Sequence, residues 1–221
     1  MVRPDNYNHL FSFEPIFNNK ITIASVLAAC ARLGAFDHGI WVHGYLWRSG
    51  LESDLVIVRM CGQSFENLQW LSGLSSLQNL DMSRVDLSKA SDWFQVTNTF
   101  PSSMLVELHM SGCELNQIPV GVANMTRLEV LNLRWNIIWG TIPQWLYTCS
   151  NLESLSLYLN LLRGEISSST GNLTAIVNLD LSANQLEGKI PSSLGNLCKL
   201  TVLDLSRNYF NGSVSEILAS L

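Results

Sequence analysis

The sequence has no long apolar run and few of the residues that catalytic sites require. It contains no stretch of about 18 apolar residues, so we predict no membrane span. Its histidines, His9, His38, His43 and His109, lack the H-E-x-x-H spacing of a metal site. A G-x-S-x-G elbow, a P-loop and a G-x-G-x-x-G loop are also absent. We therefore expect no enzyme activity, no metal and no cofactor.

Cysteine and charge are also scarce. The five cysteines are odd in number and contain no C-x-x-C pair, so neither a zinc nor a thioredoxin-like site is predicted. Charged residues make up 14% of the chain and the formal net charge is -5. This balance argues against a broad nucleic-acid-binding surface, so no nucleic-acid partner is expected.

The first part of the chain divides into three segments. Residues 1–18 are polar and aperiodic, lack the apolar segment of a secretory signal, and are interpreted as a loose leader. Residues 19–58 carry two apolar patterns at helical spacing, separated by a break at Gly34, which predicts a helical hairpin. Residues 59–67 form a junction without a clear pattern.

The hairpin contains an S-V-L-x-A-C-A-x-L-G turn, a G-x-x-V-H-G helix and a G-L-x-S-D ending. With these features, Ile21–Leu55 resembles one pentatricopeptide repeat of the longer plant organellar type. Such proteins read RNA through many stacked hairpins, about one base for each repeat. A different sequence follows this single unit, so RNA binding remains an alternative function and not the expected one.

The remaining chain, residues 68–221, is dominated by one repeated pattern. Four copies follow one another at a step of 24 residues between Thr126 and Val214, and two irregular copies precede them. A strand leucine recurs at Leu131, Leu155, Leu179 and Leu203. An asparagine recurs at Asn136, Asn160, Asn184 and Asn208, with a glycine four residues after each. We count six repeats and expect the array to be truncated at Leu221.

Each position of the pattern has a physical role. Two leucines per copy alternate along a short strand, point inward and stack on neighbouring copies, while strands of successive copies pair in parallel. The asparagines are expected to form a structural ladder, because their side chains can satisfy loop backbone groups that have no sheet partner. Val85 and Cys113 take this position in the irregular copies, so the first coil should be the least well formed. The glycine favours a positive φ.

The full form L-x-x-L-x-L-x-x-N-x-L-x-G-x-I-P resembles the plant-specific class of leucine-rich repeat, and Leu68–Trp93 and Gly140–Leu157 are similar to plant receptor-like proteins. The resemblance implies an α/β leucine-rich repeat solenoid with its parallel sheet on the concave face. It also implies recognition of a protein or peptide ligand, with a co-receptor as a further partner, at the extracellular face of the plasma membrane. Defence or developmental signalling is the implied role. A nonfunctional gene fusion or fragment is an alternative, since the caps and the transmembrane helix of that family are not found.

The outward strand residues are the candidates for ligand binding, because Tyr, Trp and Arg are the usual interface anchors. The candidate partner-binding residues are His109, Arg134, Trp135, Tyr158 and Arg207. Arg134, Trp135 and Tyr158 fall on adjacent copies in nearly matching columns, so they should be neighbours. Trp139 and Trp145 follow the strand and are expected to be structural.

Three N-x-S/T sequons make Asn124, Asn172 and Asn211 candidate N-glycosylation sites if the chain is secreted. Asn124 and Asn172 share one place in the repeat, seven residues before the strand leucine. One exposed position is therefore expected to be modified twice.

Overall fold

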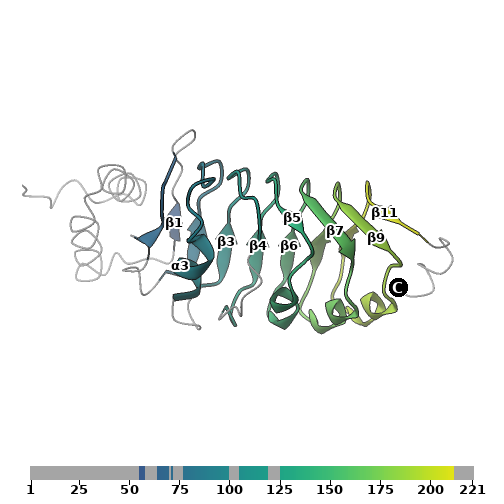
Figure 1. Ribbon diagram of the computed structural model, residues 1–221. Coiled ribbons are helices and arrows are strands. Elements are labelled where there is room, and N and C mark those ends of the chain that lie inside the picture. Colours follow the sequence, from purple (N-terminus) through teal and green to yellow (C-terminus); the bar gives the residue numbers. More distant parts are fainter. Residues whose placement is uncertain are drawn as a thin grey trace, which may run out of the picture.

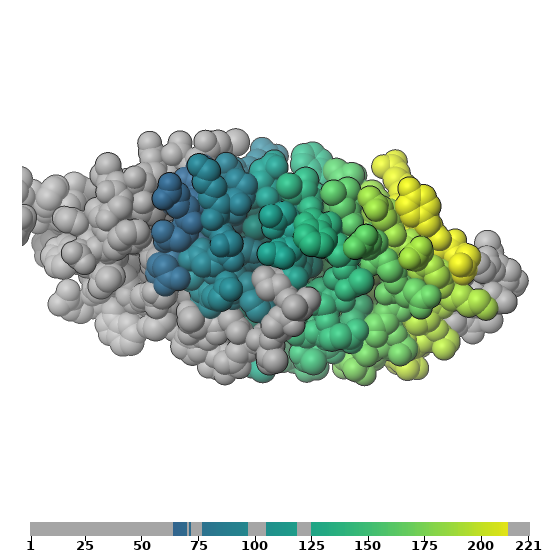
Figure 2. All heavy atoms as spheres, viewed as in Figure 1, coloured from purple at the N-terminus to yellow at the C-terminus, as the bar shows by residue number. Residues whose placement is uncertain are grey.

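The computed structural model describes residues 55–57, 64–69, 71, 77–99, 105–118 and 125–211. These residues form a solenoid in which each coil adds one strand to a parallel sheet (Figure 1). Figure 2 shows successive coils packed directly against one another along its length. The leucine-rich repeat solenoid with a parallel sheet is therefore confirmed. The leader and most of the predicted hairpin lie outside the described residues.

The main sheet has seven parallel strands in the order β1-β2-β3-β4-β6-β8-β10. They are β1 (Leu55–Ile57), β2 (Asn79–Asp81), β3 (Glu107–His109), β4 (Val130–Asn132), β6 (Ser154–Ser156), β8 (Asn178–Asp180) and β10 (Val202–Asp204). From β2 onward, the register places a leucine opposite a leucine at every step. This alignment is the basis of a continuous core.

A second parallel sheet lies on another side of the coils, in the order β11-β9-β7-β5. Its strands are β5 (Trp139–Gly140), β7 (Leu161–Glu165), β9 (Gln185–Gly188) and β11 (Tyr209–Phe210). The repeated glycines lie in β5, β7 and β9, with φ of 100°, 83° and 77° at Gly140, Gly164 and Gly188. The expected positive φ is confirmed there, whereas the pattern did not predict that these segments pair as a sheet.

Short helices complete the coils on the side away from the main sheet (Figure 1). They are the α-helix α3 (Trp93–Thr99) and the 3-10 helices η3 (Gln144–Thr148), η4 (Ser168–Asn172) and η5 (Ser192–Asn196). Helix α3 lies in the first repeat, which is longer than the others. The longer repeat therefore contains an additional helix, and the register between β2 and β3 is unchanged.

The first described strand of the main sheet lies outside the range predicted for the array. Residues 55–58 were assigned to the hairpin and 59–67 to a junction, but Leu55–Ile57 pair with β2, with Leu55 opposite Asn79. Ser64 also forms a bridge to Asp86. The main sheet thus includes a strand from the range predicted as hairpin, and an apolar, mostly β-branched triplet suits such a strand. Its three residues are too few to show a period of their own.

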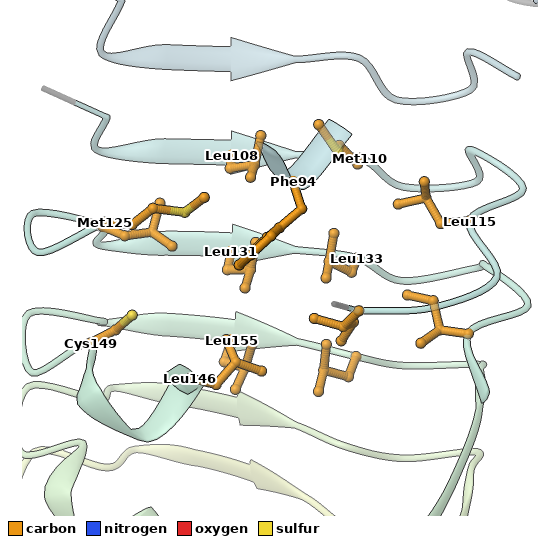
Figure 3. Close-up of a cluster of buried hydrophobic side chains, with 14 of the residues drawn as sticks. Phe94, Leu108, Met110, Leu115, Met125, Leu131, Leu133, Leu146, Cys149 and Leu155 are labelled. Carbon is orange, nitrogen blue, oxygen red and sulfur yellow. The ribbon is translucent and has the colours of Figure 1, made fainter. Parts of the chain in front are cut away.

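The core is a column of leucines shared between coils. Leu131 and Leu133 are buried, while Asn132 between them is only half-buried and faces the concave side. Figure 3 shows Leu108, Leu131 and Leu155 stacked from strand to strand, with Phe94 reaching from α3 toward this column. Burial of each leucine therefore depends on the coils on both sides of it.

Side-chain amides connect each coil to the one before it. Asn160 Nδ2 donates to the carbonyls of Leu133 and Leu157, both at 3.0 Å, and its Oδ1 accepts from the Ile138 N–H at 3.1 Å. Equivalent bonds are made by Asn136, Asn184 and Asn208. In the coil before Asn136, the Cys113 thiol takes over the donor role and donates to the Met82 carbonyl at 3.1 Å. Val85 is buried at this position one coil earlier and has no polar side-chain atom.

Replacing Leu179 should test the shared core. Leu179 is 1% exposed and lies between Leu155 and Leu203 in the sheet register. We expect Leu179→Ala to lower the free energy of unfolding by about 2–5 kcal/mol, because the cavity is bordered by two neighbouring coils. Leu159→Ala is the matched control, since Leu159 is 44% exposed. Equal losses in urea titrations of the two variants would contradict a stacked core.

Replacing Asn184 should test the ladder. Asn184→Ala removes the donor to the carbonyls of Leu157 and Leu181 and the acceptor for the Leu162 N–H. Each buried backbone group left without a hydrogen-bond partner costs about 1–3 kcal/mol, so we expect a marked drop in the free energy of unfolding. Asn196→Ala, at an exposed asparagine, should be nearly neutral. A neutral Asn184→Ala in thermal unfolding would rule out the ladder as a source of stability.

Candidate functional site

Each coil turns sharply one residue before its ladder position, and the residue there has a left-handed backbone. We call these positions the turn row; they are Arg84, Gly112, Trp135, Leu159, Ala183 and Arg207, with φ between 53° and 68°. The Trp135 N–H donates to the Tyr158 carbonyl at 2.9 Å, and equivalent bonds link the other coils. Trp135 is therefore a turn residue, which corrects its assignment to the strand. Most L-residues disfavour this conformation, so the residue types found at these positions do not predict it.

A hollow of about 470 Å³ opens at the ends of β2, β3 and β4. Its lining residues are Asp81, Ser83, Arg84, Ser111, Gly112, Asn132, Arg134 and Trp135. It exists because Gly112 has no side chain between Arg84 and Trp135 in the turn row. A Cβ at Gly112 would lie 4.0 Å from Arg84 Cγ and 3.8 Å from the Trp135 carbonyl oxygen. Gly112 thus lines the hollow between Arg84 and Trp135, its two neighbours in the turn row.

A chain of polar contacts forms the inner wall. Arg134 Nε donates to Ser111 Oγ at 3.3 Å, and the Ser111 N–H donates to Ser83 Oγ at 3.4 Å. The Ser83 N–H in turn donates to Asp81 Oδ1 at 2.9 Å. Neither Arg84 nor Arg134 forms an ion pair with a carboxylate of the described residues. The hollow therefore has two guanidinium groups against a single carboxylate.

A row of exposed apolar side chains leads away from the hollow, and we call it the apolar ridge. Trp135, Ile137 and Trp139 are 56%, 47% and 57% exposed, whereas the residues between them are buried. Leu159 and Leu161, on the next coil, are each 44% exposed. Trp139 and Leu161 are direct partners between β5 and β7, so the ridge is continuous across two coils. Such a contiguous apolar surface is a typical feature of interaction sites.

The structure brings together part of the predicted set. Arg134 and Trp135 both line the hollow, and Tyr158 adjoins them as a half-buried residue of the next coil. His109 is on β3, between Asp81 and Asn132 in the register, with its Nε2 3.3 Å from Glu107 Oε2. Arg207 is three coils beyond Trp135 in the turn row, so it belongs to a different part of the face.

Several contributors were not predicted. Arg84, Asp81 and Gly112 belong to the irregular first copies, where the variable step hides the shared turn row. Trp139 was expected to be structural and is instead exposed on the ridge. A signal was present in Ile137 and Trp139, since residues two apart in an extended segment share one face.

The described residues include no cluster that could hold a metal ion, and two of their three cysteines, Cys113 and Cys149, are buried. No group of three or more His, Cys, Asp or Glu side chains in them could hold a metal ion, and none of their helices is long and apolar enough to cross a membrane. Burial raises the pKa of the Cys113 thiol to about 12 and that of the Cys149 thiol to about 11. Both thiols are therefore protonated near neutral pH and act as small apolar groups.

Comparison with known proteins agrees with the fold. Residues 127–149, 175–197 and 199–221 match the Leucine Rich Repeat family. The structure is similar to a TDR receptor, at 28% identity and a TM-score of 0.54, over 64% of this chain and 24% of that one. It is also similar to the Arabidopsis receptor kinase HAESA, solved with the peptide hormone IDA and the co-receptor SERK1, at 25% identity and a TM-score of 0.52, over 66% of this chain and 25% of that one.

A third similar structure is the ectodomain of the plant membrane receptor kinase GASSHO1/SCHENGEN3 from Arabidopsis thaliana. It is 26% identical, with a TM-score of 0.50, over 71% of this chain and 22% of that one. The leucine-rich repeat region thus resembles plant receptor ectodomains, and the chain spans about a quarter of the length of these proteins. Such repeat modules are typically non-catalytic.

Sequence comparison also finds pentatricopeptide repeat-containing proteins of Arabidopsis thaliana. One is 45% identical over 49 residues, which is 22% of this chain and 9% of the relative. A mitochondrial one is 46% identical over 43 residues, which is 20% of this chain and 8% of the relative. The chain therefore spans less than a tenth of either relative, and the similarity is distant and partial.

Two tryptophans of one coil should respond differently to truncation. Trp145 is 6% exposed, and its ring centroid lies 5.3 Å from that of Phe94, whereas Trp139 is 57% exposed. We expect Trp145→Ala to cost about 3–5 kcal/mol of unfolding free energy. Trp139→Ala should change it by no more than about 0.5 kcal/mol, as for other exposed positions. Chemical denaturation measures both, and similar losses would contradict the exposure of the ridge.

Proposed function

From the resemblance of its repeats to plant receptor ectodomains, we propose that the chain is the ligand-recognition module of a plant receptor-like protein. It binds a peptide or protein ligand on its concave face without catalysing a reaction. Its place is the extracellular face of the plasma membrane, in defence or developmental signalling. The observation that carries the proposal is the hollow joined to the apolar ridge at Trp135.

The physical character of this surface supports ligand binding. Trp, Tyr and Arg are enriched among the residues that dominate binding energy, and Arg134, Trp135 and Tyr158 are neighbours here. They are held on a scaffold fixed by the sheet and the ladder, so little conformational entropy is lost when a ligand binds. HAESA, a similar structure, is seen with a peptide hormone and a co-receptor. We propose that this chain likewise binds a peptide ligand and a co-receptor.

The pentatricopeptide similarity supports a separate proposal about domain organisation. The pentatricopeptide-like unit predicted within residues 19–58 precedes the leucine-rich repeats in the sequence, and Leu55–Ile57 at its end already pair with β2. RNA recognition by that family uses stacked repeats that each read about one base. One unit offers too small a surface for this, and roughly three stacked repeats of this kind are needed for a stable array. Peptide recognition by the solenoid therefore remains the preferred function.

Selection from a synthetic random peptide mixture should test ligand recognition. The full chain is immobilised, bound peptides are identified by mass spectrometry, and their affinities for the chain are measured by calorimetry. We expect Trp135→Ala and Tyr158→Ala to weaken binding about tenfold or more, since truncating an interface anchor costs above about 1 kcal/mol. The control is Lys199→Ala, which changes an exposed residue and should bind normally. Leu197→Ala is unsuitable as a control, because Leu197 lies within the core.

Unchanged affinity in both aromatic variants would place the binding surface elsewhere and contradict the proposed site. Recovery of no peptide at all would contradict peptide recognition itself.

We also propose that Asn172 and Asn211 carry N-glycans when the chain is secreted. Both side chains are exposed, while Asn124 lies outside the described residues. The chain is fused to a signal peptide, secreted from plant cells and mapped by glycopeptide mass spectrometry. Asn172→Gln should remove one glycan, and the control Asn151→Gln, at an exposed asparagine outside any sequon, should remove none. An unmodified Asn172 in folded, secreted protein would contradict this.

A further inference from the structure

We propose that the chain forms a twofold-symmetric dimer through the part of the apolar ridge that lies beyond Trp135. We call this part the dimer patch; it consists of Ile137, Trp139, Leu159 and Leu161. Its occupant is a second copy of this chain. The dimer is separate from the proposed ligand site, because the ligand anchors Arg134, Trp135 and Tyr158 are not in the patch.

The dimer patch is confined to two adjacent coils. Ile137 and Trp139 are 47% and 57% exposed on one coil, and Leu159 and Leu161 are each 44% exposed on the next. The corresponding exposed residues on the two bordering coils are all polar; they are Glu114, Asn116, Gln185 and Glu187. A bounded apolar surface with a polar rim is typical of an interface between proteins.

The patch has two matching halves, one from each coil, which suits a twofold axis. Trp139 and Leu161 are direct partners between the neighbouring strands β5 and β7 (Figure 1), and Ile137 and Leu159 precede them by two residues. In an isologous contact, residue i of one copy meets residue j of the other, and j meets i. A twofold axis parallel to the strands, between β5 and β7, therefore places Trp139 of each copy against Leu161 of the other.

The extent of the patch suits the centre of such an interface. Four large side chains, each about half exposed, present an apolar surface on the order of a few hundred Å². A standard interface buries about 800 Å² on each partner and combines an apolar core with a polar rim. The patch supplies the core, and the polar side chains of the bordering coils supply the rim.

The charges around the patch favour a second copy over a nucleic acid or a lipid surface. The patch is uncharged and is bordered by the exposed Glu114, Glu165, Glu187 and Arg163, none of which forms an ion pair with the described residues. Nucleic acids and anionic membranes are bound by basic surfaces, and this border is mainly acidic. In the twofold arrangement, Arg163 of each copy comes opposite the uncharged Thr141 of the other, so the core buries no charge.

Light scattering of the full chain over a dilution series should show a dimer that dissociates into monomers. Trp139→Glu and Leu161→Lys should each raise the dissociation constant about a hundredfold or more, because each places an unpaired charge in the apolar core. The matched control is Val202→Glu, since Val202 is 52% exposed on β10, outside the patch, and this variant should remain dimeric.

Mixing the two charged variants should test the twofold arrangement itself. In a mixed dimer, the carboxylate introduced at position 139 meets the ammonium group introduced at position 161, while Leu161 of the first variant meets Trp139 of the second. Two chains that are monomeric alone should therefore form a dimer together, with a dissociation constant at least about tenfold below that of either variant alone.

A natural chain that stays monomeric at every concentration, or a dimer that survives either charged variant, would overturn the proposed dimer. A mixture of the two variants that remains monomeric would also overturn it, because the twofold arrangement requires recovery. Circular dichroism verifies that each variant is folded. Peptide binding by Trp139→Glu, which retains Trp135 and Tyr158, tests the ligand function separately from the dimer.

Association also affects how stability is measured. A dimer stabilises the folded state only at concentrations where it forms. The small stability change expected above for Trp139→Ala is therefore measured at dilutions where the chain is monomeric.

Discussion

The hydrogen bond between a side-chain amide and the backbone of the preceding coil underlies the whole structure. A strand of three residues pairs only a few backbone groups, and the chain must then turn while still partly buried. Asn136 and its equivalents satisfy the groups left over, on their own coil and on the one before. Without these bonds each coil would leave several buried polar groups unpaired, at about 1–3 kcal/mol each. The stacked leucines supply most of the apolar burial, but the amides determine where each coil bends.

This division of roles explains why the side chains of the outward surface are free to vary. The leucines face the core and the asparagines face the turn, so the side chains beside them are not needed for core packing or for the ladder. The hollow and the ridge are both made from such positions. Their geometry is inherited from the coil spacing, and their chemistry depends only on which side chains the chain places there. A surface of this type has a rigid backbone and variable side chains.

Much of the fold was predictable because its periodicity is explicit. The 24-residue step located the leucines, the asparagines and the glycines, and with them the core and the sheet. Leu55–Ile57 escaped detection because three residues carry no period and follow a segment with helical spacing. In the site, Arg134, Trp135 and Tyr158 were found from matching columns. The hollow was not, because it depends on a missing side chain at Gly112 and on Arg84 in a coil of irregular length.

The turn row also has an evolutionary consequence. Its left-handed backbone is held by the neighbouring coil, so glycine, alanine, leucine, tryptophan and arginine all occupy it in one chain. A non-glycine residue there costs roughly 1–2 kcal/mol, which the inter-coil bonds offset. The outward side chains can therefore change through single substitutions in this row, one coil at a time, without a compensating change in the core. In such a solenoid the backbone and the core stay constant while the outward side chains differ from coil to coil. Duplicated copies can therefore diverge in their outward side chains while keeping one fold.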